Sequence, residues 1–191
     1  MIFQHFRGNI RRLMLTCTAA VALMVVPVIA QSPAKVYPVK TVVAPVSNKV
    51  ADFTWMEGDK QVSLSEVGKN KVILLNFWAT WCAPCRKEIP DLVELSKELP
   101  NTEFIVLGVS VDRDQDAINT VSKFARAKNL PYTVIVANDE LVKAYGGINA
   151  IPSTFILTSE GTVSEKIAGM KSKAEFLAAI QKAMKHNQSQ K

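Results

Sequence analysis

Residues 72–85 read VILLNFWATWCAPC, and this stretch decides the fold. Its first seven residues form a nearly continuous apolar run, which is typical of a buried strand. Apolar residues then recur at helical spacing over residues 88–99. We therefore expect Cys82 and Cys85 at a strand-to-helix turn, with Cys82 at or just before the start of the helix and Pro84 in its first turn.

The position of Cys82 favours redox chemistry. The thiolate is the nucleophile in disulfide exchange, and a free cysteine has a pKa of about 8.5. A helix N-terminus presents unpaired N–H groups and a partial charge of roughly +0.5, so it stabilises Cys82 as the anion. We predict that Cys82 attacks a substrate disulfide, and that Cys85 then resolves the mixed disulfide and leaves a Cys82–Cys85 bridge.

Glu88 is a candidate proton acceptor for this chemistry. It lies three residues after Cys85, hence on the same face of the expected helix. If it is partly buried, its pKa is raised and it can accept the proton that Cys85 loses. The alternative is an exposed acid in the first turn that stabilises the helix dipole. The sequence leaves both interpretations open.

Two structural interpretations of the cysteine pair are weaker. A zinc site needs about four ligands, and the chain offers only Cys17, His5 and His186 besides the pair, all near its two ends. The sequence therefore predicts no metal site. A purely structural bridge across so short a loop would constrain the unfolded chain very little.

Composition limits the class of protein. The chain has 191 residues, of which 48% are hydrophobic and 21% charged, and this fits one globular domain with short additions. Outside residues 1–30 the net charge is +3, because that segment holds three of the 23 basic residues and none of the 17 acidic ones. Such a mild excess does not indicate nucleic-acid binding.

Residues 1–30 are predicted to be an export leader. They combine a positively charged start with an apolar stretch over 13–28 and a candidate cleavage site after Ala30. The alternative is an uncleaved anchor in the inner membrane, since the stretch approaches the roughly 20 residues that a spanning helix needs. Either case places the domain in the periplasm or another extracytoplasmic, oxidising compartment.

Residues 31–50 contain three prolines among valines and lysines, which predicts an extended linker or a loosely docked arm. A domain is predicted over residues 51–185, and a flexible tail over 186–191. Within the domain we expect a hairpin over 53–64, parallel strands at 72–77 and 104–111 joined through a helix at 84–99, a helix at 114–127, strands at 132–136, 154–157 and 163–168, a short helix at 139–145, and a last helix that begins with a capping box at 172–175.

The stretch NFWATWCAPCRKEIP at 76–90 resembles the thioredoxin superfamily, and within it the TlpA/ResA-like thiol–disulfide oxidoreductases. Further matching residues are GVSVD at 108–112, IPSTFIL at 151–157, Gly161 and Gly169. The resemblance covers roughly residues 51–184. It implies an α/β thioredoxin fold, a central mixed sheet flanked by helices, with an N-terminal hairpin and a helix–strand insertion at 114–136.

The same resemblance implies a substrate surface. Ile151 and Pro152 correspond to the cis-proline dipeptide of the family, which places this loop beside the cysteines and lets the Ile151 backbone pair with an extended peptide. A simpler alternative is that Pro152 only begins a strand. Trp81, Ala83 and Pro84 complete the expected surface, with Trp81 shielding the disulfide.

One position departs from ordinary thioredoxins. They carry a buried aspartate where this chain has Asn76, and an amide cannot serve as a carboxylate base. TlpA/ResA-like proteins have asparagine there and a glutamate at the position of Glu88. The resemblance therefore supports Glu88 as the proton acceptor.

The predicted function is an exported thiol–disulfide oxidoreductase that reduces client proteins and needs no cofactor beyond its Cys82–Cys85 disulfide. The resemblance suggests cytochrome c maturation as one setting and a membrane thiol–disulfide protein as the electron donor. We expect a monomer, because lysine and glutamate make the last helix polar.

Two other functions stay open. A thiol peroxidase of the peroxiredoxin-like class usually has a Pro-x-x-x-Thr-x-x-Cys run, and this chain has Leu75 and Ala79 at the proline and threonine positions. A copper chaperone on the same fold would use a distant histidine, for which only His186 is available on the C-terminal side.

Overall fold

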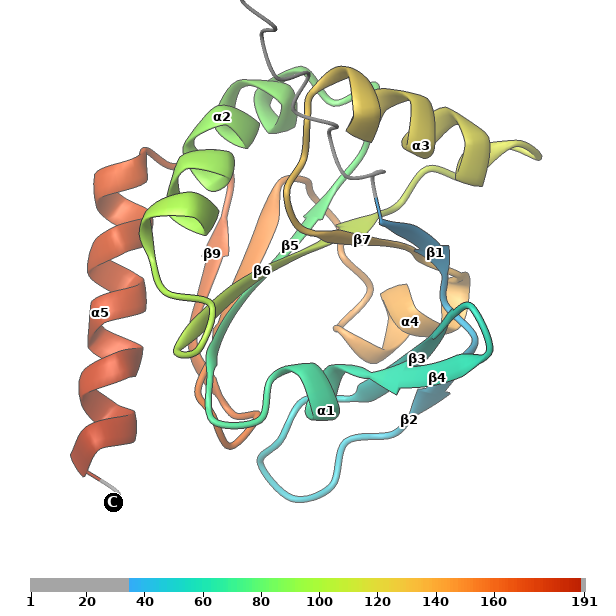
Figure 1. Cartoon of the computed structure of the whole chain (residues 1–191). Helices are drawn as coiled ribbons and strands as arrows, with labels where there is room; N and C mark the ends of the chain where they lie inside the picture. Colours follow the sequence, from blue (N-terminus) through green and yellow to red (C-terminus); the bar gives the residue numbers. More distant parts are fainter. Residues whose placement is uncertain (1–34, 190–191) are drawn as a thin grey trace, which may run out of the picture. The chain divides into compact units, whose positions relative to one another are not determined.

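The computed structural model describes residues 35–189, so the predicted leader lies outside the described residues (Figure 1). The elements are, in chain order, β1 (Val36–Pro38), β2 (Thr41–Val43), β3 (Asp52–Glu57), β4 (Lys60–Ser63), α1 (Leu64–Val67), β5 (Val72–Trp78), α2 (Ala83–Glu98), β6 (Phe104–Ser110), α3 (Ala117–Ala127), β7 (Thr133–Val136), α4 (Asp139–Ala144), β8 (Ser153–Leu157), β9 (Val163–Ala168) and α5 (Lys173–Ser189). Between residues 35 and 189, no helix has the length and apolar character to cross a membrane.

A six-stranded mixed sheet forms the centre of the domain. Its strand order is β1-β7-β6-β5-β8-β9, in which β1, β7, β6 and β5 run parallel and β8 and β9 alternate in direction. The parallel β5–β6 pair, connected through α2, is the crossover that the sequence predicts. The predicted α/β thioredoxin fold with its mixed sheet and flanking helices is confirmed.

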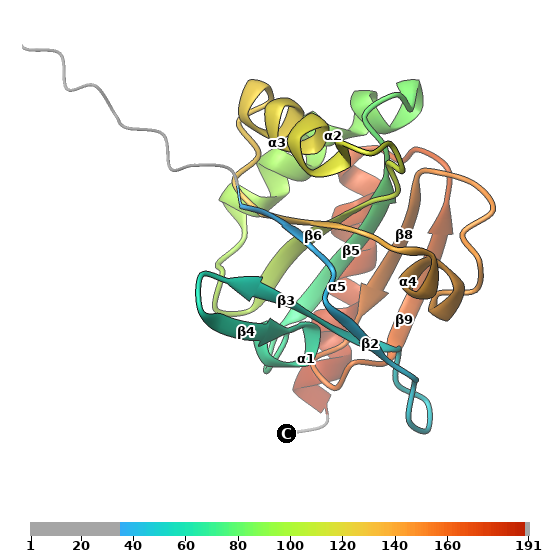
Figure 2. The same ribbon diagram turned by 90° about the vertical axis from the view of Figure 1, so that its right-hand side faces the viewer.

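Helices and the second sheet cover the two faces of the central sheet (Figures 1 and 2), and its middle strands β5, β6 and β8 are buried almost throughout. Along β5, Val72, Leu74 and Trp78 pack with residues of α2, α3 and α5, whereas alternate residues such as Phe77 pack on the opposite face with Trp55 and other residues of the second sheet, α1 and α4. Successive side chains of a strand point to opposite faces. A strand covered on both faces is largely apolar, which explains the run at 72–78, where Asn76 is the one polar residue.

Residues 31–50 are predicted to be an extended linker or a loosely docked arm, and the part that the structure describes, residues 35–50, is a docked arm with two strands rather than a linker. Strand β1 is the edge of the central sheet, where it pairs with β7, and β2 forms a second antiparallel sheet with β3 and β4 (Figure 2). Tyr37 and Val42 are half-buried against the core on the hairpin side. Pro38 ends β1, a position that an edge strand tolerates because proline lacks an N–H.

The predicted tail also starts too early. Helix α5 continues to Ser189, and the Asn187 side-chain oxygen accepts the Ser159 N–H at 3.2 Å. The capping box at the start of α5 is confirmed, since the Ser172 N–H donates to Glu175 at 2.9 Å. The insertion predicted at 114–136 supplies α3 and β7, and β7 lies inside the sheet between β1 and β6.

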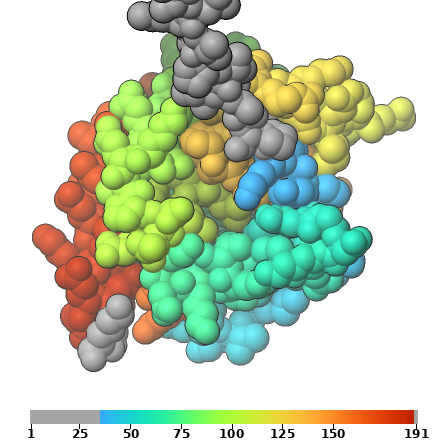
Figure 3. Space-filling model, viewed as in Figure 1, coloured from blue at the N-terminus to red at the C-terminus, as the bar shows by residue number. Residues whose placement is uncertain are grey.

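A hollow of about 560 Å³ lies where β6 begins, at the end of the sheet opposite to the C-terminal end of β5 (Figure 3). Trp55, Lys60, Phe104 and Tyr132 are among its lining residues. An apolar hollow of about 360 Å³ lies near Val43 and Leu157. Neither hollow is lined by Cys82 or Cys85.

Replacing Tyr145 tests how the N-terminal sheet is attached to the domain. The buried Tyr145 hydroxyl donates to the Ala51 carbonyl at 2.8 Å, so Tyr145→Phe leaves this acceptor without a partner. We expect the free energy of unfolding to fall by about 1–2 kcal/mol. Tyr37→Phe is the matched control, because the half-buried Tyr37 hydroxyl bonds to no other residue within 35–189, and it should cost far less. Denaturant titration measures both, and equal losses would contradict the assignment.

Candidate active site

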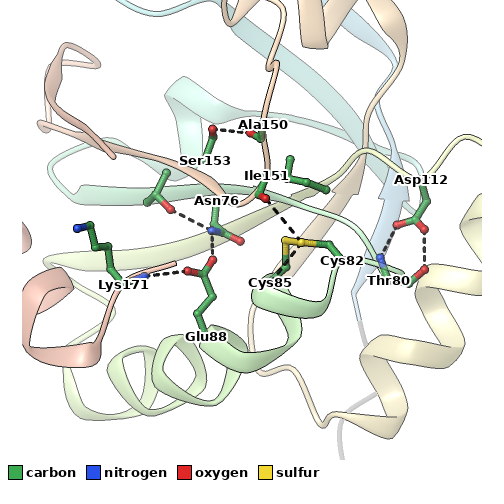
Figure 4. Close-up of a disulfide and its surroundings, with 11 residues drawn as sticks. Asn76, Thr80, Cys82, Cys85, Glu88, Asp112, Ala150, Ile151, Ser153 and Lys171 are labelled. Carbon is green, nitrogen blue, oxygen red and sulfur yellow. Dashed lines mark hydrogen bonds between the residues drawn. A yellow bond between two sulfur atoms is a disulfide. The ribbon is translucent and has the colours of Figure 1, made fainter. Parts of the chain in front are cut away.

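Cys82 and Cys85 form a disulfide at the start of α2 (Figure 4). Cys82 is the N-cap residue, and the backbone N–H of Cys85 donates to Cys82 Sγ at 3.2 Å. Pro84 lies in the first turn, as predicted. Both cysteines are buried, with exposed fractions of 4% for Cys82 and 0% for Cys85, so the slight accessibility that remains belongs to Cys82.

The helix start favours negative charge on Cys82. The first turn of α2 contains no acidic residue, and Arg86 and Lys87 follow it on the exposed side. The unpaired N–H groups of the first turn point toward the N-cap and carry a partial positive charge. The N–H that contacts Cys82 Sγ in the disulfide is therefore positioned to stabilise the thiolate after reduction.

Glu88 is buried, with an exposed fraction of 1%, so the interpretation as an exposed first-turn acid is wrong. Its carboxylate accepts Asn76 Nδ2–H at 2.8 Å and the Lys171 backbone N–H at 3.4 Å (Figure 4). Burial raises the pKa of Glu88 to about 7; the two hydrogen bonds partly offset this, and the nearby Asp91 adds to it. Glu88 can thus gain or lose a proton near neutral pH.

Asn76 connects Glu88 to the neighbouring strand. Its amide also donates to Thr154 Oγ1 at 3.0 Å, and the register places Asn76 directly opposite Thr154 in the β5–β8 pair. No role for Thr154 was predicted, although its position two residues after Pro152, in the strand expected to follow the cis-proline loop, could have indicated one. The Lys171 contact uses the backbone, and no side-chain pattern could have revealed it.

The Ile151–Pro152 peptide bond is cis, and the loop lies beside the disulfide as the resemblance implied (Figure 4). Cys82 Sγ is 3.8 Å from the Ile151 carbonyl oxygen, a contact rather than a hydrogen bond because a disulfide sulfur carries no proton. Ser153 Oγ donates to the Ala150 carbonyl at 2.8 Å, and the Gly169 N–H donates to the Pro152 carbonyl at 2.9 Å. These bonds fix the loop next to Cys82.

The surface next to Cys82 in the chain is apolar. Trp81 is 67% exposed, and Ala83 and Pro84 are exposed at the start of α2. Ile151 is half-buried and Pro152 is buried. The structure therefore brings the loop of Ile151 to Cys82, while Trp81 projects into solvent.

Comparison with known proteins agrees with this geometry. The model of the AhpC/TSA family matches residues 46–166. A thiol–disulfide oxidoreductase named ResA from Bacillus cereus is 30% identical over 129 residues, which cover 68% of this chain and 72% of that protein.

Solved structures show the same likeness. A thiol:disulfide interchange protein of the thioredoxin family from Chlorobium tepidum is 32% identical with a TM-score of 0.63, covering 74% of this chain and 99% of that one. A secreted thiol-disulfide isomerase from Corynebacterium glutamicum is 29% identical with a TM-score of 0.57, covering 68% and 80%.

The raised pKa of Glu88 predicts a pH-dependent stability of the oxidised protein. The folded state holds the Glu88 proton more tightly than the unfolded state, so this stabilisation is complete below about pH 4.5 and is lost as the pH rises through about 7. The loss should approach roughly 3 kcal/mol. Glu88→Gln should remove this slope, whereas the exposed control Glu140→Gln should keep it. Parallel stability curves for wild type and Glu88→Gln, from denaturant titration at several pH values, would argue against a raised pKa.

Proposed function

The chain belongs to the AhpC/TSA family, and we propose that it acts as an exported reductant of disulfides in client proteins. Its relatives establish the broader activity, which is thiol–disulfide exchange on a thioredoxin fold. The observation that carries the proposal is the Cys85 N–H directed at Cys82 Sγ, at a helix start that lies beside the cis-proline loop.

The reaction starts from the reduced dithiol. The Cys82 thiolate attacks one sulfur of a client disulfide, the S–S bond of the client breaks, and its other sulfur leaves as a thiolate. The Cys85 thiolate then attacks Cys82 Sγ in the mixed disulfide. The client leaves with two thiols, and the chain keeps the Cys82–Cys85 disulfide seen in the structure, so two electrons have passed to the client.

Glu88 accepts the proton that Cys85 must lose before the second step. Both side chains are buried and lie three positions apart on α2, and Glu88 has a pKa of about 7. An acceptor with a pKa near the working pH is efficient, because its basic form is populated and still binds a proton. Asn76 and the Lys171 N–H hold the carboxylate in place.

The client binds as an extended segment along the cis-proline loop. Among residues 35–189, the backbone N–H and C=O of Ile151 form no hydrogen bond with another backbone group, so both are available to pair with a peptide. Trp81, Ala83 and Pro84 offer apolar contacts around the attacking sulfur. This surface suits a protein client better than a small molecule.

Export, the direction of electron flow and the partners belong to the same proposal. The leader predicted at residues 1–30 supports export to the periplasm or another extracytoplasmic compartment, whether it is cleaved or retained as an anchor, and one similar solved structure is described as secreted.

In such an oxidising compartment a reductant needs a membrane thiol–disulfide donor. Cytochrome c maturation is one fitting setting. We propose a monomer without cofactors or nucleic-acid partners.

The site offers little to a thiol peroxidase. Leu75 and Ala79 are fully buried apolar residues, so no threonine hydroxyl is available at position 79 to bind a peroxide beside Cys82. Cys82 is instead bonded to a cysteine three residues away, as a dithiol exchange centre requires.

Trapping of clients tests the function directly. Cys85→Ala removes the resolving thiol, so mixed disulfides between Cys82 and native clients should accumulate in the host. Cys82→Ala keeps Cys85, which is 0% exposed, and is the matched control that should trap nothing. Both variants carry Cys17→Ser, and trapped partners are identified by mass spectrometry after non-reducing electrophoresis. Trapping by Cys82→Ala instead of Cys85→Ala would reverse the assigned roles.

The proton acceptor is tested by the kinetics of resolution. Glu88→Gln keeps the hydrogen-bonding shape of the side chain but cannot take a proton, so release of a mixed disulfide should slow by about 10²-fold at neutral pH. The pH profile should also lose its inflection near 7. Stopped-flow measurements with a small disulfide substrate give both quantities. If Glu88→Gln and the control Glu140→Gln share the wild-type profile, Glu88 is not the acceptor.

A further inference from the structure

Asp112 is a second buried carboxylate near the cysteines, and the mechanism above does not use it (Figure 4). Its exposed fraction is 2%. Asp112 Oδ2 accepts the Thr80 backbone N–H at 3.0 Å and the Ser110 hydroxyl at 2.6 Å, and Asp112 Oδ1 accepts the Thr80 hydroxyl at 2.6 Å. Two of these three donors therefore belong to one residue of the segment that precedes Cys82.

No cation neutralises Asp112 within residues 35–189. The adjacent Arg113 instead forms an exposed ion pair with Asp139 at 2.7 Å. Burying a carboxylate costs free energy unless hydrogen bonds satisfy it, and neutral donors are the only compensation here. A buried apolar residue at this position would avoid that cost. The presence of a carboxylate is therefore better explained by the segment that its hydrogen bonds hold in place.

Asp112 holds the connection between β5 and α2. Only four residues separate Trp78, the last residue of β5, from Ala83, the first residue of α2. The Trp78 carbonyl accepts the Val111 N–H at 2.8 Å, which fixes the start of the connection. Thr80 is fixed in the middle through both its backbone and its side chain, so the path from the strand to the helix start has little freedom.

Packing fixes the two ends of this path, because Ala79 and Cys82 are buried, but it does not fix the middle. Trp81, which stands between Thr80 and Cys82, is 67% exposed, and Thr80 itself is half-exposed. Beyond Asp112, a single bond from the Cys82 N–H to the Ala79 carbonyl, at 3.1 Å, closes the turn. The hydrogen bonds to Asp112 are thus the main restraint on the middle of the connection, and through it they help to set where Cys82 Sγ lies relative to the Cys85 N–H.

We propose that Asp112 is a positioning residue for disulfide exchange, which acts through Thr80 to hold Cys82 over the N-terminus of α2. The stabilisation of a thiolate by backbone N–H groups depends on short distance and alignment. Loss of the Asp112–Thr80 contact lets the connection move and weakens that stabilisation while leaving the fold in place. The inference rests on the proposed role of Cys82 as the attacking thiolate.

The test is the pH profile of Cys82 alkylation in the reduced full chain carrying Cys17→Ser and Cys85→Ala. Thr80→Val keeps the size of the side chain but removes the hydroxyl that bonds Asp112. It should raise the pH midpoint of alkylation by about half a unit or more, which below the midpoint slows alkylation about threefold. Thr80→Ser restores the hydroxyl and should return the midpoint to that of the parent.

Ser110→Ala is the matched control. It removes one hydrogen bond to the same carboxylate and the acceptor of the Asp112 backbone N–H, but no bond to the connection, so it should lower stability without moving the midpoint. If it moves the midpoint as far as Thr80→Val, or if Thr80→Val moves nothing, the positioning role is refuted. The parent tests the proposed function separately. If the pH midpoint of Cys82 alkylation in the parent lies below the value of about 8.5 for a free cysteine, Cys82 is stabilised as a thiolate and only the positioning role of Asp112 has failed.

Asp112→Asn provides a second route if Thr80→Val does not fold. Asparagine keeps the shape of the side chain and one acceptor oxygen but weakens the contacts to Thr80. If Asp112 positions Cys82, the Asp112→Asn variant should have a raised pH midpoint of Cys82 alkylation. If Asp112 acted through its charge, removing that charge would favour the thiolate and lower the midpoint, and this outcome would overturn the proposal.

Discussion

The hydrogen bond from the Cys85 N–H to Cys82 Sγ is the interaction on which the rest of the site depends. It exists because β5 delivers the chain to the start of α2 through four residues, and because Asp112 restrains the middle of that connection. The cis-proline loop then brings the Ile151 carbonyl to the same sulfur. A helix start, a sheet and a loop thus converge on one atom that can carry a negative charge.

The two buried carboxylates near this atom have different surroundings. Asp112 has three donors within 3.0 Å, two of them from the segment that leads to Cys82. Glu88 has one donor at 2.8 Å and another at 3.4 Å, and burial raises its pKa to about 7. The two donors of Glu88, one of them at 3.4 Å, suit a group that exchanges a proton, whereas the three shorter contacts of Asp112 suit an anchor.

The sequence predicted the parts of the site that local patterns specify. The apolar run of β5, the helix after it and the capping position of Cys82 all follow from spacing, and the structure confirms them. It left a linker and a docked arm both open for residues 31–50 and missed the strands β1 and β2, because prolines at the ends of edge strands resemble those of a linker. It missed Thr154 and the Lys171 N–H, because cross-strand register and backbone donors become visible only once the sheet is assembled.

The central claim is that the start of α2 stabilises the Cys82 thiolate, and ultraviolet titration of thiolate absorbance in the reduced full chain measures this most directly. With Cys17 replaced by serine, the account predicts two separate transitions, the first assigned to Cys82 at a pKa within about 3.5–7.5 and the second to the buried Cys85 at a higher value. A first transition at or above the pKa of about 8.5 that a free cysteine shows would contradict the account.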